Sequence, residues 1–195
     1  MTGGDHDDVG PQEAAGGVRE LRRLSGQALS RAWSRLLGSR APTAVVLIRL
    51  AVGVVFASEG IQKFLYAESQ GAGRFAKIGI PAPDVMGPFV GVVEIVCGLL
   101  VLAGLFTRLA AVALAINMVV AIASTKVPIL LGHGYWIFAH TFAPKAGFWA
   151  SLHESRTDLS MLLGSSFLLL VGAGSWSLDA LLQRQVQRAR TETKP

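Results

Sequence analysis

Long apolar runs separated by short polar breaks fill the middle of the chain, and this pattern predicts membrane-spanning helices. Between Phe89 and Thr125 the charged residues are Glu94 and Arg108 alone. About 20 helical residues cross the hydrocarbon core of a bilayer, which is about 30 Å thick. We therefore predict two spans in this stretch, at residues 89–105 and 109–125, joined by a tight turn.

Two further spans are predicted on either side of this pair. Residues 42–63 form the first span, which opens on a proline that suits the first helical turn. Residues 159–178 carry no charge and form the fourth span. The segment 66–88 is rich in glycine and proline and is predicted to be a loop with one helical turn at about 74–78. Glycine, proline and many aromatic residues indicate an irregular loop at the membrane interface over residues 127–155.

The fold class that these runs predict is an all-α membrane protein, a four-transmembrane-helix bundle. By composition the chain divides into a glycine-rich acidic tail expected to be disordered (1–17), a basic amphipathic segment (18–40), the membrane domain (42–181) and a basic C-terminal tail (182–195). For the basic amphipathic segment, a helix lying on an anionic membrane surface and a loosely helical cytosolic tail fit the sequence equally well.

The distribution of charge predicts the orientation in the membrane. Twelve of the 18 lysines and arginines lie on the side of the two termini, and cytoplasmic segments carry the excess of such residues, so both termini are predicted to be cytoplasmic. The chain is 51% hydrophobic and 16% charged, well below the roughly 25% charge of soluble domains. Its net charge of +5 does not indicate nucleic acid, because the basic residues flank apolar spans. The single cysteine, Cys97, excludes an intramolecular disulfide.

The predicted spans place a cluster of charged residues near the outer face of the bundle. Glu94 lies inside the second span on a face of small residues, and a lipid-exposed carboxylate there would be costly. Lys63 and Glu59 reach a similar depth from the first span, so we expect Lys63 to be the partner of Glu94. Glu94, Glu59 and Lys63 are the candidate catalytic residues, as a proton-handling cluster. An ion-pair network that holds the helices together would use the same residues.

Other polar residues are candidates for binding or for structure. Asn117 shares a stripe with small residues on the third span, so we expect its amide to hydrogen-bond to another helix. The candidate substrate- or quinone-binding residues are Asn117, His153, Asp158 and Phe56. The expected structural charge pairs near the inner face involve Arg49, Arg108 and Asp179. The irregular spacing of the histidines predicts no metal site.

Several ordered motifs in the predicted spans point to a family. They are Arg49-Leu50 with Gly53, Phe56, Glu59-Gly60 and Lys63, then Ile78-Gly79-Ile80-Pro81, then Glu94 with Gly98-Leu99-Leu100, Gly104 and Thr107-Arg108-Leu109-Ala110-Ala111, and finally Gly172-Ala173-Gly174-Ser175-Trp176-Ser177-Leu178-Asp179. Together they resemble the DoxX family of small four-helix bacterial membrane proteins, over roughly residues 45–181. The motif positions that carry over are Arg49, Gly60, Lys63, Glu94, Arg108 and Asp179.

The resemblance implies a multi-pass protein of the bacterial plasma membrane that is associated with oxidoreductase chemistry. Some relatives are subunits of quinone-reducing systems for sulfur compounds, and others are linked to thiol and oxidative-stress homeostasis. The leading hypothesis is therefore a subunit or partner of a membrane oxidoreductase that meets quinone, whose isoprenoid tail would lie in the apolar cleft between helices. The alternatives are a small proton-coupled transporter and a non-catalytic anchor for a soluble redox enzyme.

The sequence contains no visible haem, flavin or iron–sulfur motif. The resemblance therefore implies that quinone or a soluble or membrane redox enzyme supplies the electron chemistry. Both an oxidoreductase subunit and a non-catalytic protein are compatible with the residues, and the lipid bilayer is the expected surrounding of the four spans.

Overall fold

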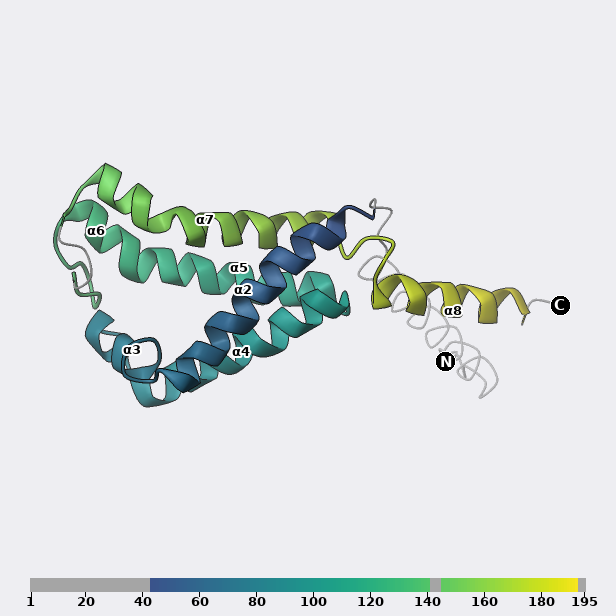
Figure 1. Cartoon of the computed structure of the whole chain (residues 1–195), viewed down its shortest axis with the longest axis horizontal. Helices are drawn as coiled ribbons and strands as arrows, with labels where there is room; N and C mark the ends of the chain where they lie inside the picture. Colours follow the sequence, from purple (N-terminus) through teal and green to yellow (C-terminus); the bar gives the residue numbers. More distant parts are fainter. Residues whose placement is uncertain (1–42, 141–144, 193–195) are drawn as a thin grey trace, which may run out of the picture. The chain divides into compact units, whose positions relative to one another are not determined.

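The computed structural model describes residues 43–140 and 145–192, and within these ranges it contains helices and no strand (Figure 1). The elements are α2 (Val45–Leu65), α3 (Ala72–Ile78), α4 (Pro83–Ala103), α5 (Thr107–Ala121), the π-helix η1 (Ile122–Lys126), α6 (Val127–Leu131), α7 (Phe148–Val171) and α8 (Leu178–Glu192). The all-α class is thereby confirmed for the described part of the chain. The predicted segments 1–17 and 18–40 lie outside the described residues, and residues 182–192 of the predicted basic tail continue helix α8.

Three stretches of the described chain are long and apolar enough to cross a membrane. They are α2, α4 and the continuous stretch Thr107–Leu131, which consists of α5, η1 and α6. These stretches correspond to the first three predicted spans. The second of them begins at Pro83 rather than at Phe89, because Pro83 occupies the first turn of α4 and Pro88 is accommodated inside the helix. The predicted helical turn at 74–78 is helix α3.

Helix α7 differs from the predicted fourth span at residues 159–178. It begins at Phe148, before the predicted start of the span, and ends at Val171, so residues 172–178 of the predicted span lie outside α7. Its C-terminus is followed by Gly172 and Gly174, whose positive φ values of 87° and 81° suit glycine and end the helix. The polar residues in its N-terminal half hid the start of the helix from the hydrophobic pattern. That α7 is a fourth span, and which side each terminus faces, stay predictions.

The segment 127–155 is more helical than predicted. Its first residues form α6 and its last ones the first two turns of α7, while Tyr135 and Phe138 form an isolated antiparallel bridge. Gly132 and Gly147, with φ values of 77° and 105°, lie next to the ends of these helices. The glycines therefore bound two helices instead of making the whole segment irregular.

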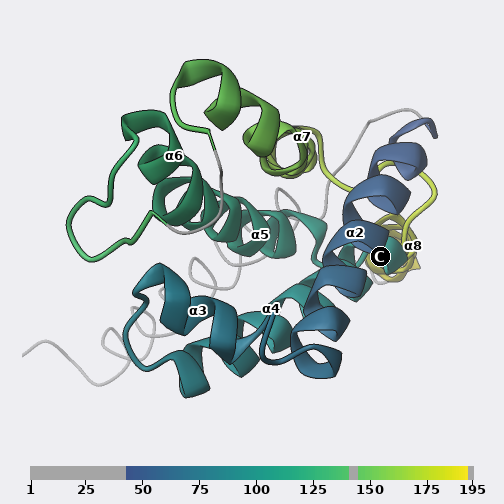
Figure 2. The same ribbon diagram turned by 60° about the vertical axis from the view of Figure 1, so that its left-hand side comes forward.

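The helices pack as two pairs, α2 with α4 and α5 with α7 (Figures 1 and 2). Glycines set the close approach of the first pair. A Cβ added to Gly60 would lie 2.6 Å from the carbonyl oxygen of Gly91, and one added to Gly53 would lie 2.8 Å from that of Gly98. Small residues that allow such backbone contact are typical of helix packing in membranes. The face of small residues that the sequence shows around Glu94 on the second span therefore lies at the α2–α4 interface.

A second set of contacts between helices involves Arg49, Asp179 and the turn at residues 104–106. We call this region the Arg49 end. The guanidinium of Arg49 is buried and donates hydrogen bonds to four carbonyls, two at the end of α4 and two between α7 and α8, namely those of Val101, Leu102, Ala173 and Trp176. The Asp179 carboxylate accepts from the amides of Phe106 and Thr107 at 2.9 and 3.2 Å, which caps the start of α5. The hydrogen bonds of both charges go to main-chain groups and not to each other, so the charge pairing expected from the sequence is not seen here.

The turn at the Arg49 end depends on Gly104. Its φ is 68°, and a Cβ there would lie 2.6 Å from Cζ of Arg49, so a glycine is required on both counts. Nearby, Arg108 of α5 donates to the carbonyl of Leu170 on α7 at 3.2 Å. The Arg49 end thus ties all four long helices together through charged side chains and backbone groups.

Candidate functional site

A cavity of about 470 Å³ lies among α2, α3, α4, α5, η1 and α7. On α2, Lys63 lines it, whereas Arg49 lies 14 residues, or about 21 Å at 1.5 Å per residue, nearer the start of the helix. The cavity is therefore at the opposite end of the bundle from the Arg49 end. Its volume falls in the range of about 300–1,000 Å³ that small-molecule sites occupy.

One wall of the cavity carries the Glu94 cluster, which consists of Glu94, Lys63 and Asn117. Glu94 is only 3% exposed. Its Oε2 accepts from Lys63 Nζ at 2.6 Å, and its Oε1 accepts from Asn117 Nδ2 at 2.7 Å. Each carboxylate oxygen thus has its own donor from a different helix, as a buried charge requires. The predicted Lys63–Glu94 ion pair and the predicted interhelical bond of Asn117 are both confirmed as contacts.

Glu59 lies beside this cluster and lines the same cavity. Lys63 is four residues further along α2, at ion-pair spacing, but its ammonium is directed to Glu94. Among the described residues the carboxylate of Glu59 has neither a hydrogen bond nor an ion pair, and its side chain is exposed. Glu59 therefore presents a charge to the cavity close to the buried Glu94.

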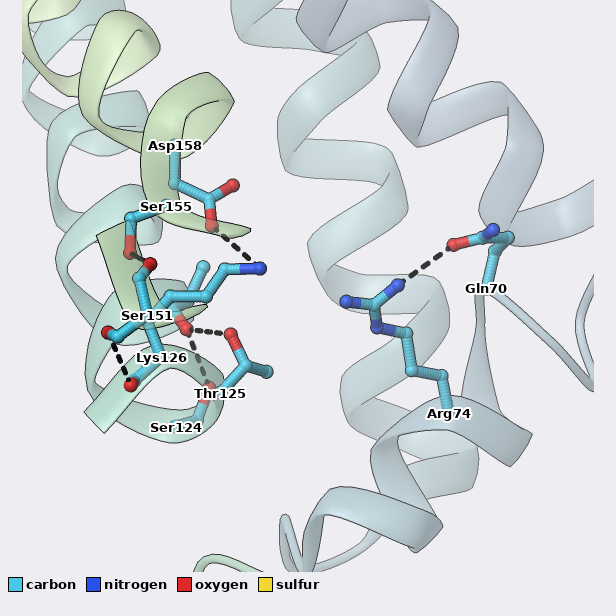
Figure 3. Close-up of polar contacts among 9 residues, drawn as sticks. Gln70, Arg74, Ser124, Thr125, Lys126, Ser151, Ser155 and Asp158 are labelled. Carbon is cyan, nitrogen blue, oxygen red and sulfur yellow. Dashed lines mark hydrogen bonds and ion pairs between the residues drawn. The ribbon is translucent and has the colours of Figure 1, made fainter. Parts of the chain in front are cut away.

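The opposite wall is formed by η1 and the start of α7. Lys126 Nζ and Asp158 Oδ2 are 3.4 Å apart, and both line the cavity. The side chains of Ser124 and Thr125 donate to the carbonyl of Ala121, at 3.3 and 2.6 Å. Figure 3 shows this wall on its left. Ser124, Thr125 and Lys126 all line the cavity, so the π-helical stretch contributes three consecutive side chains to one surface.

The π-helix has an identifiable cause in the sequence. Pro128 lies two residues after its last residue, Lys126, and has no amide to continue the regular hydrogen-bond ladder of the preceding turn. Hydroxyl groups bind the carbonyls of this stretch instead: Tyr135 donates to Ala123 at 2.7 Å and Ser151 to Lys126 at 2.9 Å. Single π-turns inside α-helices are frequent at functional sites.

Several predicted site residues meet at the cavity and one does not. Phe56 and Asp158 line it together with the Glu94 cluster and Glu59. His153 is not part of the lining, and its ring contacts Arg156 of its own helix at 3.3 Å. The position of His153 therefore does not support the binding role expected for it.

Two further cations line the cavity, Lys126 and Arg74. Lys126 pairs with Asp158, and Arg74 donates to Gln70 at 3.2 Å, as seen on the right of Figure 3. The sequence contains an indication of the Lys126–Asp158 pair, because Lys126 directly follows one apolar run and Asp158 directly precedes the next. In residues 43–140 and 145–192, no group of three or more His, Cys, Asp or Glu side chains is arranged to hold a metal ion.

Three helices of membrane-spanning length and a buried, paired carboxylate beside a cavity define an α-helical integral membrane protein. The chain belongs to the DoxX family. Residues 44–134 match the DoxX family model. The chain is also similar to an uncharacterized membrane protein of Mycobacterium tuberculosis (strain ATCC 25618 / H37Rv), at 54% identity over 153 residues, which is 78% of this chain and 90% of that protein. No solved structure matches.

Proposed function

We propose that the cavity binds the headgroup of a membrane quinone and that the protein is the quinone-contacting subunit or partner of an oxidoreductase system. The observation that carries this proposal is the Glu94 cluster at the wall of the cavity. Reducing a quinone consumes electrons and protons, so a quinone site needs groups that donate protons beside groups that bind carbonyl oxygens. The family resemblance to quinone-linked proteins supports the same assignment.

The residues at the cavity fit a quinone headgroup. Lys63 and Asn117 each use one donor on Glu94 and keep another that can bind a quinone carbonyl. Glu94 is a carboxylate in the described cluster, so it must first take up a proton, which the exposed Glu59 can pass to it from solvent, before it delivers that proton to the reduced quinone. Lys126 supplies a donor on the opposite wall. The electrons come from a separate redox enzyme, because the chain has no visible motif for a redox cofactor.

The proposal includes an orientation in the bacterial plasma membrane with four spans and cytoplasmic termini. With 24 residues, α7 is about 36 Å long, enough to cross the hydrocarbon core. Twelve of the 18 basic residues then lie on the cytoplasmic side, and the cavity lies at the outer end.

The test is purification in mild detergent, with quinone extraction and proteomics on the same sample. We expect wild-type protein to retain quinone and a redox enzyme, and Glu94→Gln to lose proton-coupled quinone reduction while remaining folded. Glu68→Gln is the matched control, because Glu68 is exposed and does not line the cavity. A partner enzyme without quinone would support the anchor alternative. Substrate flux in liposomes with neither quinone nor enzyme would support the transporter alternative, and either result would contradict the proposal.

A further inference from the structure

A hairpin in the loop after α6 contacts the η1 wall of the cavity. Residues 132–139 run from the end of α6 toward α3 (Figure 1). Tyr135 and Phe138 in this segment exchange both of their backbone hydrogen bonds, at 3.0 and 2.9 Å, which closes a two-residue hairpin. The hydroxyl of Tyr135 donates to the carbonyl of Ala123 in η1 at 2.7 Å. One end of the hairpin is therefore fixed to η1.

The other end of the hairpin is fixed to α3. The amide of Ala139 donates to the carbonyl of Ile78, the last residue of α3, at 2.8 Å. Gly79 follows with a φ of 92°, and a Cβ at this position would collide with the carbonyl oxygen of Ile137, so glycine is required where the hairpin rests on α3. Ile78 lines the cavity, as three residues of η1 do. The hairpin therefore holds two walls of the cavity together.

The turn of this hairpin is strained. Trp136 occupies its first central position with a φ of 51°, a conformation that favours glycine and that bulky side chains rarely adopt. The side chain is 85% exposed, so burial of the indole does not account for this conformation. The bonds of Tyr135 and Ala139 on either side of the turn hold it in place. The hairpin is thus maintained by the two walls that it connects.

Pro128 deprives one carbonyl of η1 of a backbone donor, and Tyr135 replaces that donor. In the π-turn the amide of Val127 donates to the carbonyl of Ile122, five residues before it. The carbonyl of Ala123 would then need the amide of residue 128, which is a proline and has none. In α-helical spacing the amide of Val127 would return to Ala123, and the carbonyl of the next residue would lack a donor instead. Because the Tyr135 hydroxyl reaches Ala123, it stabilises the π-turn over the α-helical alternative.

The π-turn also decides where the side chain of Lys126 lies. Lys126 is the last residue of η1, and its ammonium is 3.4 Å from the carboxylate of Asp158 on α7 (Figure 3). A change from π-helical to α-helical spacing removes one residue from the turn and rotates the residues after it by about 100° relative to those before it. Lys126 would then leave both Asp158 and the cavity.

We propose that residues 132–139 form a clasp on the cavity and that Tyr135 is a positioning residue, because its hydroxyl keeps η1 in the π-helical form that holds Lys126 in the cavity. The clasp sets the shape of the cavity whichever ligand the cavity takes. For the proposed function, it means that the donor on the wall opposite Glu94 is available only while the clasp is closed. This consequence alone rests on the proposed quinone headgroup site.

The test is zero-length cross-linking of Lys126 to Asp158 with a water-soluble carbodiimide, which joins an amine and a carboxylate only when they are in contact. The protein is kept in lipid nanodiscs, and the cross-linked peptide is quantified by mass spectrometry with Asp158→Asn as the background. We expect Tyr135→Phe to lower the yield at least about threefold, because the π-turn then has a carbonyl without a donor within a stretch of membrane-spanning length. Tyr66→Phe, at an exposed tyrosine outside the cavity lining, is the matched control and should give the wild-type yield.

A second variant covers the case in which Tyr135→Phe does not fold, which the loss of its thermal unfolding transition would reveal. Gly79→Ala displaces the hairpin from α3 and leaves Tyr135 itself unchanged, so the Lys126–Asp158 cross-link should fall here as well. Wild-type yield in a folded Tyr135→Phe protein, or in Gly79→Ala if the first variant is unfolded, would overturn the clasp. Failure of the wild-type protein to retain quinone would contradict the proposed headgroup site and leave the clasp standing.

Discussion

Removing the charge of Glu94 should destabilise the bundle through the ammonium that it leaves behind. In Glu94→Gln the Lys63 side chain, only 11% exposed, remains next to a neutral amide. Breaking a buried ion pair typically costs about 3–5 kcal/mol, and because Lys63 faces a cavity that water can enter, we take the lower end, about 3 kcal/mol. At about 2–4 °C per kcal/mol for a chain of this size, the melting temperature should fall by about 6–12 °C.

The double variant tests whether this loss of stability arises from the ion pair of Lys63 with Glu94. Lys63→Met alone leaves Glu94 with Asn117 as its remaining partner and should also be destabilising. Combining Lys63→Met with Glu94→Gln removes both charges, so the double variant should regain at least about 2 kcal/mol relative to the sum of the single losses. The assay is thermal unfolding in nanodiscs of the wild type, both single variants and the double variant.

A comparison cycle on Lys126 and Asp158 serves as the control. That pair is longer, 3.4 Å against 2.6 Å, and its carboxylate is 22% exposed against 4% for Glu94, so its coupling should be smaller than that of Lys63 with Glu94. Strictly additive losses for Lys63 and Glu94 would refute the reasoning, because they would mean that the ion pair contributes no coupling. Full quinone-linked activity in a folded Glu94→Gln protein would exclude the proton-delivering role but leave the structural one.

Three further predictions follow from other parts of the bundle. Asn117→Leu removes an interhelical hydrogen bond and should lower the free energy of unfolding by about 1 kcal/mol, measured by thermal unfolding in nanodiscs. Gly60→Ala places a methyl group 2.6 Å from the carbonyl oxygen of Gly91 and should cost about 1–3 kcal/mol by the same measurement. Cysteines introduced at Ser69 and Lys145 of a Cys-free variant should react with an impermeant thiol reagent added outside intact cells, because both positions lie in loops at the cavity end.

Each of these predictions has a control. Ile116→Leu changes an exposed side chain next to Asn117 and should leave stability unchanged. Ser58→Ala, at an exposed position two residues before Gly60, should likewise have little effect. A cysteine at Leu105, in the turn at the Arg49 end, should react only after the cells are opened. Labelling in the reverse pattern would show that the cavity faces the cytoplasm, and stable Asn117→Leu or Gly60→Ala variants would contradict the packing that we describe.

The pairing of Lys63 with Glu94 could be predicted from the sequence because its geometry follows from regular helices, whereas Asn117 was expected to bond another helix without Glu94 being named as its acceptor. The depths of Glu94 and Lys63 can be counted from the ends of their apolar runs, and a costly buried carboxylate restricts the partners available to it. The face of small residues around Glu94 could be recognised in the second span for the same reason. These features depend only on helical periodicity, which can be read from the spacing of residue types along the sequence.

The other wall of the cavity could not be predicted in this way. Lys126 reaches the cavity from a π-helical turn, and the shift in register that this turn introduces before Pro128 does not appear in a hydrophobic pattern. The start of α7 was hidden because a run of polar residues, 153–158, separates its aromatic first turn from its apolar remainder. His153 was predicted as a binding residue because of its side-chain chemistry. The direction of its side chain depends on where α7 begins, which is Phe148, and the sequence pattern did not indicate that start.

The contacts of Arg49 impose an order on the biogenesis of the protein. Two of its four acceptor carbonyls, those of Ala173 and Trp176, are synthesised 124 and 127 residues after the arginine itself. At about 5–20 residues per second, the ribosome needs about 6–25 s to reach them. During this interval the first helix carries an arginine whose acceptors are incomplete, and the start of α5 still lacks Asp179. A nascent chain interrupted after α7 therefore contains every apolar span but exposes an unsatisfied cation and an uncapped helix to membrane quality control.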